Sequence, residues 1–399
     1  MGLSIYGCAK KSEFSWKMVL DLKNEKLAPV LQKPNQYALQ IIYTEVDKAS
    51  EKIHLKRHQY RLDTTEYFYP ASTVKMPVAF LALEKLNLLK DSISGAGIHT
   101  PIHFDSVRPP QSPMKYDSCS PSRNPTIASL IDQVFAISDN NAYNRLFEWT
   151  GQEFINKSLY QKNIFTNSRI LTRVGVSGFD SIENTHLNPI TFLNEEGDTI
   201  YHQTAQQSVF TEYPTIRNYE KGKGYYDASS AKIIEQPFDM SQKNFINLAD
   251  LDRIIKRIVY PTLYEKEKSF KIAESDYQYL LESMAKLPED FLCYADNKDH
   301  YYDSYVKFFL FGDHKNPIPE HITIINKVGL AYGYLTDVAY IRDHKNDVEF
   351  FLSATLLVNN NEIFNDGVYE YDSVGIPFLA ELGRKIYAYE LSKKQMKLK

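Results

Sequence analysis

The sequence has little cysteine, no excess of charge of one sign and no long apolar segment. Three cysteines in 399 residues are too few for a fold that depends on a disulfide framework. The 46 basic residues face 50 acidic ones, and a net charge of −4 gives no sign of the basic surface that binds nucleic acid. The longest apolar run, Met76–Leu83, is far shorter than the roughly 18–20 residues that cross a bilayer. A soluble globular chain with one or two packed cores, and no nucleic-acid partner, is therefore expected.

Motifs for nucleotide and metal binding are also missing. The sequence contains neither a Gly-x-x-x-x-Gly-Lys-(Ser/Thr) loop nor a Gly-x-Gly-x-x-Gly loop. Two histidine pairs have the i, i+4 spacing of helical metal ligands, but His54 and His58 lie in an expected strand, and His99 and His103 in an expected loop. We therefore expect no cofactor and no metal.

The three cysteines suggest different fates. Cys119 and Cys293 are expected to be unpaired thiols, with a disulfide between them as the alternative in an oxidising compartment. Cys8 follows Ile-Tyr-Gly, which is similar to the end of a bacterial lipoprotein signal. We predict that residues 1–30 form an N-terminal segment and tether, lipidated at Cys8, which would place the protein outside the cytoplasm, in the periplasm or anchored to a membrane. An ordinary N-terminal segment is the alternative.

Strand patterns occur near both ends of the chain and helical patterns between them. Apolar residues at i, i+3, i+4, i+7 and i+8 predict a helix that begins after Asn124-Pro125, and a second helix follows at residues 141–149. We expect an α/β protein in which one antiparallel sheet is built from both termini and packs against a mostly helical lobe. The expected limits are a domain over residues 31–399, with the sheet lobe at 31–70 and 320–399, the helical lobe at 71–319, and an insertion at 191–245, in a stretch expected to be mostly loop.

Three short motifs carry residues suited to acyl transfer. Ser72-Thr73-Val74-Lys75 puts a hydroxyl and an amine on one helical face, although the same Ser-x-x-Lys spacing occurs five times in the chain. Ser138-Asp139-Asn140 occurs once, 66 residues later, and taken singly would be read as a helix cap. Lys327-Val328-Gly329 taken singly would be the end of a strand. Each motif alone is weak evidence for acyl transfer, but the three in this order are stronger evidence together.

Together the motifs resemble the signature of class A β-lactamases and penicillin-binding proteins. The resemblance extends over residues 127–151, a helix, Ser-Asp-Asn turn and helix, and over residues 327–339, a strand, glycine turn and strand. It implies the β-lactamase/transpeptidase-like fold from about Tyr37 to the C-terminal helix.

The resemblance also implies chemical roles. Ser72 would attack the substrate carbonyl and carry the acyl group, and Lys75 would take part in the proton transfer from its hydroxyl. Ser138 would pass a proton to the leaving nitrogen, with Lys327 beside it.

Further residues would bind the substrate. Asn140 would hold the amide side chain of the substrate, and Lys327 and Gly329 would form the strand beside it. Backbone N–H groups of Ser72 and Leu330 would form the oxyanion hole.

Two departures from the family pattern bear on the substrate and on turnover. Val328 has no hydroxyl to bind a substrate carboxylate, and Leu330 replaces a common small or hydroxylated residue. Class A enzymes hydrolyse the acyl-enzyme with a glutamate in a Glu-x-x-x-Asn loop. Here the alignment on Leu187-Asn188 places Asn184 at that position, so Glu183 is either the catalytic base, displaced by one residue, or a surface glutamate.

These observations predict a serine acyl hydrolase acting through a covalent Ser72 ester on a β-lactam or a related cyclic or peptide amide. The alternatives are an esterase or peptidase for a cell-wall-related substrate, which Val328 favours, and a β-lactam-binding sensor that is acylated without turnover. The partner would be a small molecule or peptide, and the oligomeric state stays open.

Overall fold

The computed structural model describes residues 13–48, 52–89, 95–212 and 214–397. The predicted lipidation site, Cys8, lies outside these residues. Within the described ranges, no helix combines the length and the apolar character needed to span a bilayer.

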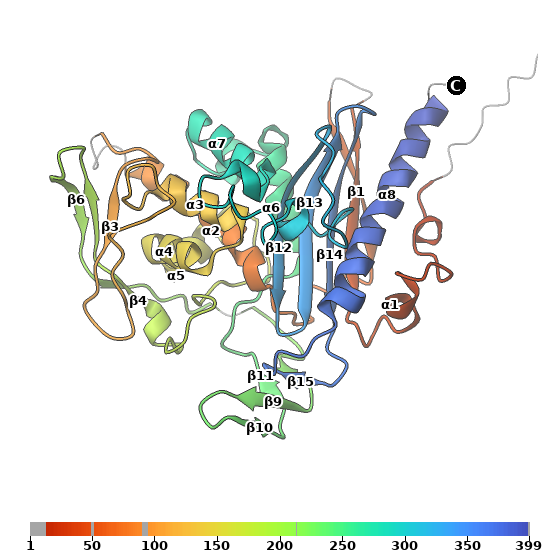
Figure 1. The fold of residues 1–399 in the computed structure, drawn as a ribbon, viewed down its shortest axis with the longest axis horizontal. Helices are drawn as coiled ribbons and strands as arrows, with labels where there is room; N and C mark the ends of the chain where they lie inside the picture. The colour runs from red at the N-terminus through yellow and green to blue at the C-terminus, as the bar shows by residue number, and fades with distance from the viewer. Residues whose placement is uncertain (1–12, 49–51, 90–94, 213, 398–399) are drawn as a thin grey trace, which may run out of the picture.

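A five-stranded antiparallel sheet occupies the centre of the molecule (Figure 1). Its strands, in spatial order, are β12 (Ile322–Ala331), β13 (Tyr334–Asp343), β14 (Val348–Leu357), β1 (Gln40–Asp47) and β2 (His54–Tyr60). The N-terminal hairpin joins the C-terminal meander through β1 and β14, which pair from Gln40 opposite Thr355 to Glu45 opposite Phe350. This arrangement confirms the prediction of one sheet assembled from both ends of the chain.

The two faces of the sheet have separate cores. On one face, sheet side chains such as Leu352 pack against residues of α8 (Ile376–Lys397) such as Leu379. The short helix α1 (Ala28–Gln32) lies on the same side of the sheet (Figure 1). Side chains of the opposite face, such as Phe351, belong to the core of the helical lobe, which also contains Phe80 and Trp149. The helices of that lobe are α2 (Lys75–Leu88), α3 (Ile127–Ala136), α4 (Asn140–Thr150), α5 (Gln152–Gln161), α6 (Leu248–Val259) and α7 (Glu274–Ala285).

Local sequence explains where α2, α3 and α4 begin. Pro77 is the third residue of α2, where its missing N–H leaves no helical hydrogen bond unmade. The cap of α3 is Thr126, which directly follows the Asn124-Pro125 pair after which the helix is predicted to begin. The Thr126 hydroxyl accepts from the Ser129 N–H at 2.9 Å. Asp139 caps α4 by accepting from the Ala142 N–H at 2.7 Å. The Ser-Asp-Asn segment therefore forms the turn between α3 and α4.

The expected insertion contains more regular structure than its polar sequence predicts. The short strands outside the central sheet, several of which lie in this insertion, are β3 (Ile102–Phe104), β4 (His186–Leu187), β5 (Ile190–Leu193), β6 (Thr199–Gln203), β7 (Gln206–Gln207), β8 (Glu220–Lys221), β9 (Gly224–Asp227), β10 (Lys232–Ile234), β11 (Phe238–Asp239) and β15 (Ile363–Phe364). They form small sheets in the orders β3-β5-β6, β4-β7, β11-β8 and β10-β9-β15. Strands of two to five residues are too short for alternation to be recognised, so these strands were not predicted, although most of the stretch lies outside strands and helices, as expected.

The expectation of unpaired thiols at Cys119 and Cys293 is also wrong. The two residues form a disulfide, with their Cα atoms 5.1 Å apart, although 174 positions separate them in the chain. Their proximity results from the packing of the loop after β3 against the loop after α7. Spacing along the sequence contains no information about that contact.

Candidate active site

The predicted nucleophile lies where the central helix begins. Ser72 is in a single 3₁₀ turn, η2 (Ala71–Val74), which continues into α2. Thr73 closes this turn by donating its hydroxyl to the Pro70 carbonyl at 2.7 Å. Ser72 is partly exposed while Thr73, Val74 and Lys75 are buried. The turn therefore presents one hydroxyl at the surface of an otherwise buried helix.

Lys75 extends from this turn toward the Ser-Asp-Asn turn. Its Nζ donates to the backbone carbonyl of Ser138, to Ser138 Oγ at 3.2 Å and to Asn140 Oδ1 at 2.7 Å. Among the described residues, no hydrogen bond joins Lys75 to the Ser72 hydroxyl, although the two residues share one turn of backbone. The structure thus brings Lys75, Ser138 and Asn140 together as the motifs predict.

Burial of Lys75 changes its protonation. The loss of water around the side chain lowers the pKa of Lys75 well below its usual value, the nearby charge of Lys327 lowers it further, and Asp139 opposes the shift. A lysine with a lowered pKa is neutral, and so able to accept a proton, at a lower pH than an ordinary lysine.

Ser138 lies between two lysines. Its Oγ accepts from Lys327 Nζ at 2.8 Å and from Lys75 Nζ at 3.2 Å. Burial lowers the pKa of Lys327 to about 7; Asp337 opposes the shift and Lys307 adds to it. The hydroxyl of Ser138 is therefore in contact with two amines whose ammonium forms are disfavoured, which is a suitable setting for passing a proton.

Strand β12 approaches the nucleophile closely because of one glycine. A Cβ atom added to Gly329 would lie 2.5 Å from the Pro70 carbonyl oxygen and 3.1 Å from Thr73 Cγ2. Leu330, the next residue, has 41% of its surface exposed. The third motif thus lies directly beside η2, as its predicted role requires.

Val328 does not face this approach. Its side chain is buried in the core on the α8 side with Leu335, whereas Lys327 faces the helical lobe. A hydroxyl at residue 328 would lie among aliphatic side chains of that core. The identity of Val328 is therefore explained by packing.

The loop that packs on Asn140 places a glycine against its side chain. Gly175 has φ +61°, and a Cβ atom at this position would collide with the side-chain amide of Asn140. The side chain of Asn144 holds Val174, the residue before Gly175. Its Oδ1 accepts from the Val174 N–H at 2.9 Å, and its Nδ2 donates to the Val174 carbonyl at 3.1 Å. The contact with Asn140 is thus made by Gly175.

Glu183 lies farther along this loop, in the single 3₁₀ turn η3 (Glu183–Thr185). Its Oε1 accepts from Arg108 Nη2 at 2.7 Å. In the described part of the chain, no hydrogen bond joins Glu183 to a residue of the three motifs. Asn184, which the sequence alignment places at the glutamate position, is buried and accepts from the Arg173 N–H at 2.7 Å. Asn184 therefore has a structural role within the loop.

Sequence reasoning missed two residues that hold this loop. Glu148 is buried and accepts from Arg173 Nε at 3.2 Å and from Asn188 Nδ2 at 3.2 Å, and Asn144 binds Val174 as described above. With Asn140, these residues recur every four positions along α4. That spacing puts three polar side chains on one helical face, a signal that the sequence does contain.

Comparisons with known proteins agree with the motifs. The model of the beta-lactamase enzyme family matches residues 24–202, whereas no curated protein matches the chain.

Similar solved structures include a variant of the class A β-lactamase of the last common ancestor of Gram-negative bacteria. It has 15% identity and a TM-score of 0.49, and the match covers 91% of this chain and 96% of that one. The β-lactamase from Sphaerobacter thermophilus has 12% identity and a TM-score of 0.49, with 94% and 96% covered. The class A β-lactamase from Mycobacterium abscessus has 13% identity and a TM-score of 0.48, with 90% and 96% covered. The family match agrees with the resemblance that the motifs predict, because residues 24–202 are similar to the beta-lactamase enzyme family.

Proposed function

We propose that this protein is a serine acyl hydrolase that forms a covalent ester at Ser72 with a β-lactam or a related cyclic or peptide amide. The observation that carries the proposal is the position of the Ser138 hydroxyl, which contacts both Lys75 and Lys327 beside the Ser72 turn. Three motifs that are far apart in the sequence thereby supply one set of proton-transfer groups.

Acylation would begin with proton transfer from the Ser72 hydroxyl to the neutral amine of Lys75 as the Ser72 oxygen attacks the carbonyl carbon. The negative charge on the carbonyl oxygen would be stabilised by the backbone N–H groups of Ser72 and Leu330. When the carbon–nitrogen bond breaks, Ser138 would donate its proton to the leaving nitrogen and recover one from Lys75. Each proton thus has a donor and an acceptor, and the product is the Ser72 ester.

Substrate binding would use the residues around this centre. Asn140 is exposed and would bind the substrate's amide side chain, as the resemblance implies. Protonated Lys327 would attract a substrate carboxylate, and an anion in contact would favour the charged form of this lysine. Leu330 would contact the substrate beside the oxyanion hole.

An intact-mass time course with benzylpenicillin tests the proposal. We expect the wild type to gain the mass of one benzylpenicillin and Ser72→Ala to gain none. Ser229→Ala is the matched control, because Ser229 begins another Ser-x-x-Lys sequence and lies on the exposed surface; this variant should form the adduct at the wild-type rate. An adduct on Ser72→Ala would exclude Ser72 as the nucleophile. A wild type without any adduct would contradict a β-lactam substrate and direct the search to esters and peptides.

A second candidate function, a β-lactam-binding protein that stays acylated, is favoured by the loop beside Asn140. Gly175 makes that contact, and the carboxylate of Glu183 is bound by Arg108. If no carboxylate of the described residues activates water at the ester, the acyl-enzyme would persist.

Replacing Glu183 by glutamine tests whether this carboxylate drives deacylation. We expect Glu183→Gln to leave the lifetime of the adduct within about twofold of wild type, because general-base catalysis would contribute about 10²–10⁴-fold if this carboxylate supplied it. The decay of the adduct mass after removal of free benzylpenicillin measures this lifetime. A lifetime prolonged by more than about tenfold would instead assign deacylation to Glu183 and establish the hydrolase.

We also propose an extracytoplasmic location. The disulfide between Cys119 and Cys293 supports it, since disulfides form and persist mainly in oxidising compartments. Lipidation at Cys8 and a membrane tether stay predictions from the sequence.

A further inference from the structure

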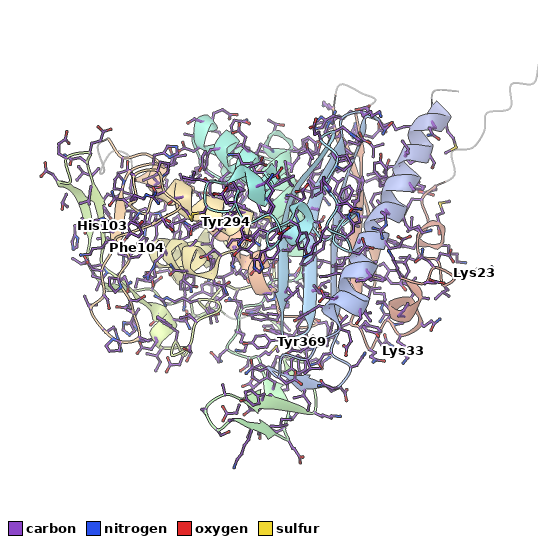
Figure 2. The ribbon with its side chains drawn as sticks, in the orientation of Figure 1. Lys23, Lys33, His103, Phe104, Tyr294 and Tyr369 are labelled. Carbon is purple, nitrogen blue, oxygen red and sulfur yellow. A yellow bond between two sulfur atoms is a disulfide. The ribbon has the colours of Figure 1, made fainter. Side chains whose placement is uncertain are left out.

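The disulfide lies close to the Ser-Asp-Asn turn. Cys119 and Cys293 join the loop after β3 to the loop after α7, and Tyr294, labelled in Figure 2, follows the second cysteine. The hydroxyl of Tyr294 lies 3.9 Å from Cys119 Sγ. Burial raises the pKa of Tyr294, and the charge of Asp139 adds to the shift, which places this ring near the middle residue of the turn.

A small hydrophobic cluster connects the disulfide to the turn and is separate from the two main cores. Its buried members are Ala136, Phe291 and Tyr294, and the partly buried residues packed against them are Cys119, Ile137, Cys293 and Tyr301. Ala136 and Ile137 immediately precede Ser138 in the chain. The residues that lead into the turn therefore pack on the disulfide and its aromatic neighbours.

Hydrogen bonds also connect the loop that contains Cys119 with the Ser-Asp-Asn turn. Asp117 accepts from the Cys119 N–H at 2.9 Å and from Gln133 Nε2 at 3.0 Å. The backbone carbonyl of Gln133 in turn accepts from the Asp139 N–H at 3.1 Å. A continuous series of contacts thus leads from the disulfide-linked loop to the residue after Ser138.

Ser138 needs such support because of its backbone. Its φ of +61° lies in the left-handed region, which residues with a side chain rarely adopt unless their surroundings hold them there. In this conformation its hydroxyl contacts both Lys75 and Lys327. If the surroundings loosen, the turn is free to relax and Ser138 Oγ to leave that position.

We propose that the Cys119–Cys293 disulfide is a positioning element of the active site, which holds Ser138 between the two lysines through the cluster and the Asp117 hydrogen bonds. The proposal rests on the proposed acyl-transfer function for its kinetic consequence, but its structural consequence is independent of that function. The disulfide would therefore affect the catalytic step more than substrate binding.

The test compares the oxidised wild type, the folded wild type after reduction by dithiothreitol, and the double variant Cys119→Ala/Cys293→Ala. With benzylpenicillin, we expect the limiting acylation rate to fall by at least about tenfold in both altered forms, while the half-saturating concentration stays within about twofold. Reoxidation of the reduced wild type should restore the rate. The reduced protein is informative even if the double variant does not fold.

A variant in another part of the fold controls for a general loss of stability. Leu379 is fully buried in the α8 core, so Leu379→Ala lowers stability by leaving a cavity on the side of the sheet away from Ser138. We expect Leu379→Ala to keep the wild-type acylation rate. A decrease equal to that of the reduced protein would show that reduced stability alone explains the effect.

Hydrogen exchange provides a readout that does not require catalysis. We expect the backbone amides of residues 136–141, including the Asp139 N–H, to exchange faster in the reduced protein than in the oxidised one, and to be unchanged in Leu379→Ala. If benzylpenicillin does not acylate the wild type, the proposed function fails while the exchange experiment still tests the positioning. Unchanged exchange and an unchanged acylation rate after reduction would overturn the inference.

Discussion

Lys75→Met should slow the acylation of Ser72 by about 10³-fold, the middle of the range for loss of a general base. Methionine preserves much of the buried volume but cannot accept the proton of Ser72 or donate to Ser138 and Asn140. The measurement is the rate of adduct formation with excess benzylpenicillin, followed by intact mass. A variant that acylates within tenfold of wild type would exclude Lys75 as the base.

The same helix provides a matched control. Lys85 is also in α2, donates to Gln203 Oε1 at 3.1 Å, and has its pKa lowered by burial to about 8. It resembles Lys75 in being a lysine of α2 whose pKa is lowered by burial, but among the residues that the structure describes no hydrogen bond joins it to the three motifs. Lys85→Met should therefore acylate within about twofold of wild type.

The pH dependence of the free energy of unfolding should give independent evidence that the amine of Lys75 is buried. Because the pKa of Lys75 is lowered in the folded protein, the unfolded chain binds more protons between that pKa and 10.5, and stability rises with pH in this window. Lys75→Met lacks this contribution. The free energy of unfolding of the variant minus that of wild type should thus decrease as pH rises from 7 toward 10, as measured by urea denaturation. A pH-independent difference would contradict the burial of a neutral amine.

Gly329→Ala should reduce acylation by about 10²-fold, the effect expected of a misplacement of roughly 1 Å at a reacting centre. The new methyl group would lie 2.5 Å from the Pro70 carbonyl oxygen, so β12 and η2 must move apart. That movement separates Lys327 from the Ser72 turn. Overpacking of this kind should also cost about 1–3 kcal/mol of stability, measurable by denaturation.

Gly97→Ala is the control for a change from glycine to alanine. Apart from Gly97 and its two chain neighbours, no atom of the residues that the structure describes lies within 4 Å of the Cβ position at Gly97, so the methyl group meets none of them. This variant should match wild type in both acylation and stability. Wild-type acylation by Gly329→Ala would show that the close approach of β12 has no part in placing Lys327.

The sequence predicts the parts of the fold that follow from strong periodicity. The strands near both ends of the chain and the helices on both sides of the Ser-Asp-Asn turn occur where the sequence predicts them. One sheet built from both ends was predictable because strand patterns occur at both ends of the chain. The short strands of the insertion were not, because two to five residues do not establish a period.

The site was predictable to the extent that its residues lie in motifs. Lys75, Ser138, Asn140 and Lys327 come together as the resemblance implies. The direction of the Val328 side chain depends on which face of β12 each residue takes, and the pairing of Cys119 with Cys293 depends on how two loops pack. Both are tertiary features. The placement of Glu183 beside Arg108 depends on the path of an irregular loop, which no periodicity determines.

The pairing of β1 with β14 determines when during synthesis the candidate site can form. Ser72, Lys75 and Ser138 leave the ribosome early, but β1 pairs with β14, about 310 residues later in the chain. Lys327 also lies on a strand from that late segment. Contacts between such distant segments make folding slow, and until they form, the helical lobe exposes the surface that the sheet covers in the folded protein. Lys327 can therefore contact Ser138 only after this late segment has been synthesised and has paired with the rest of the sheet.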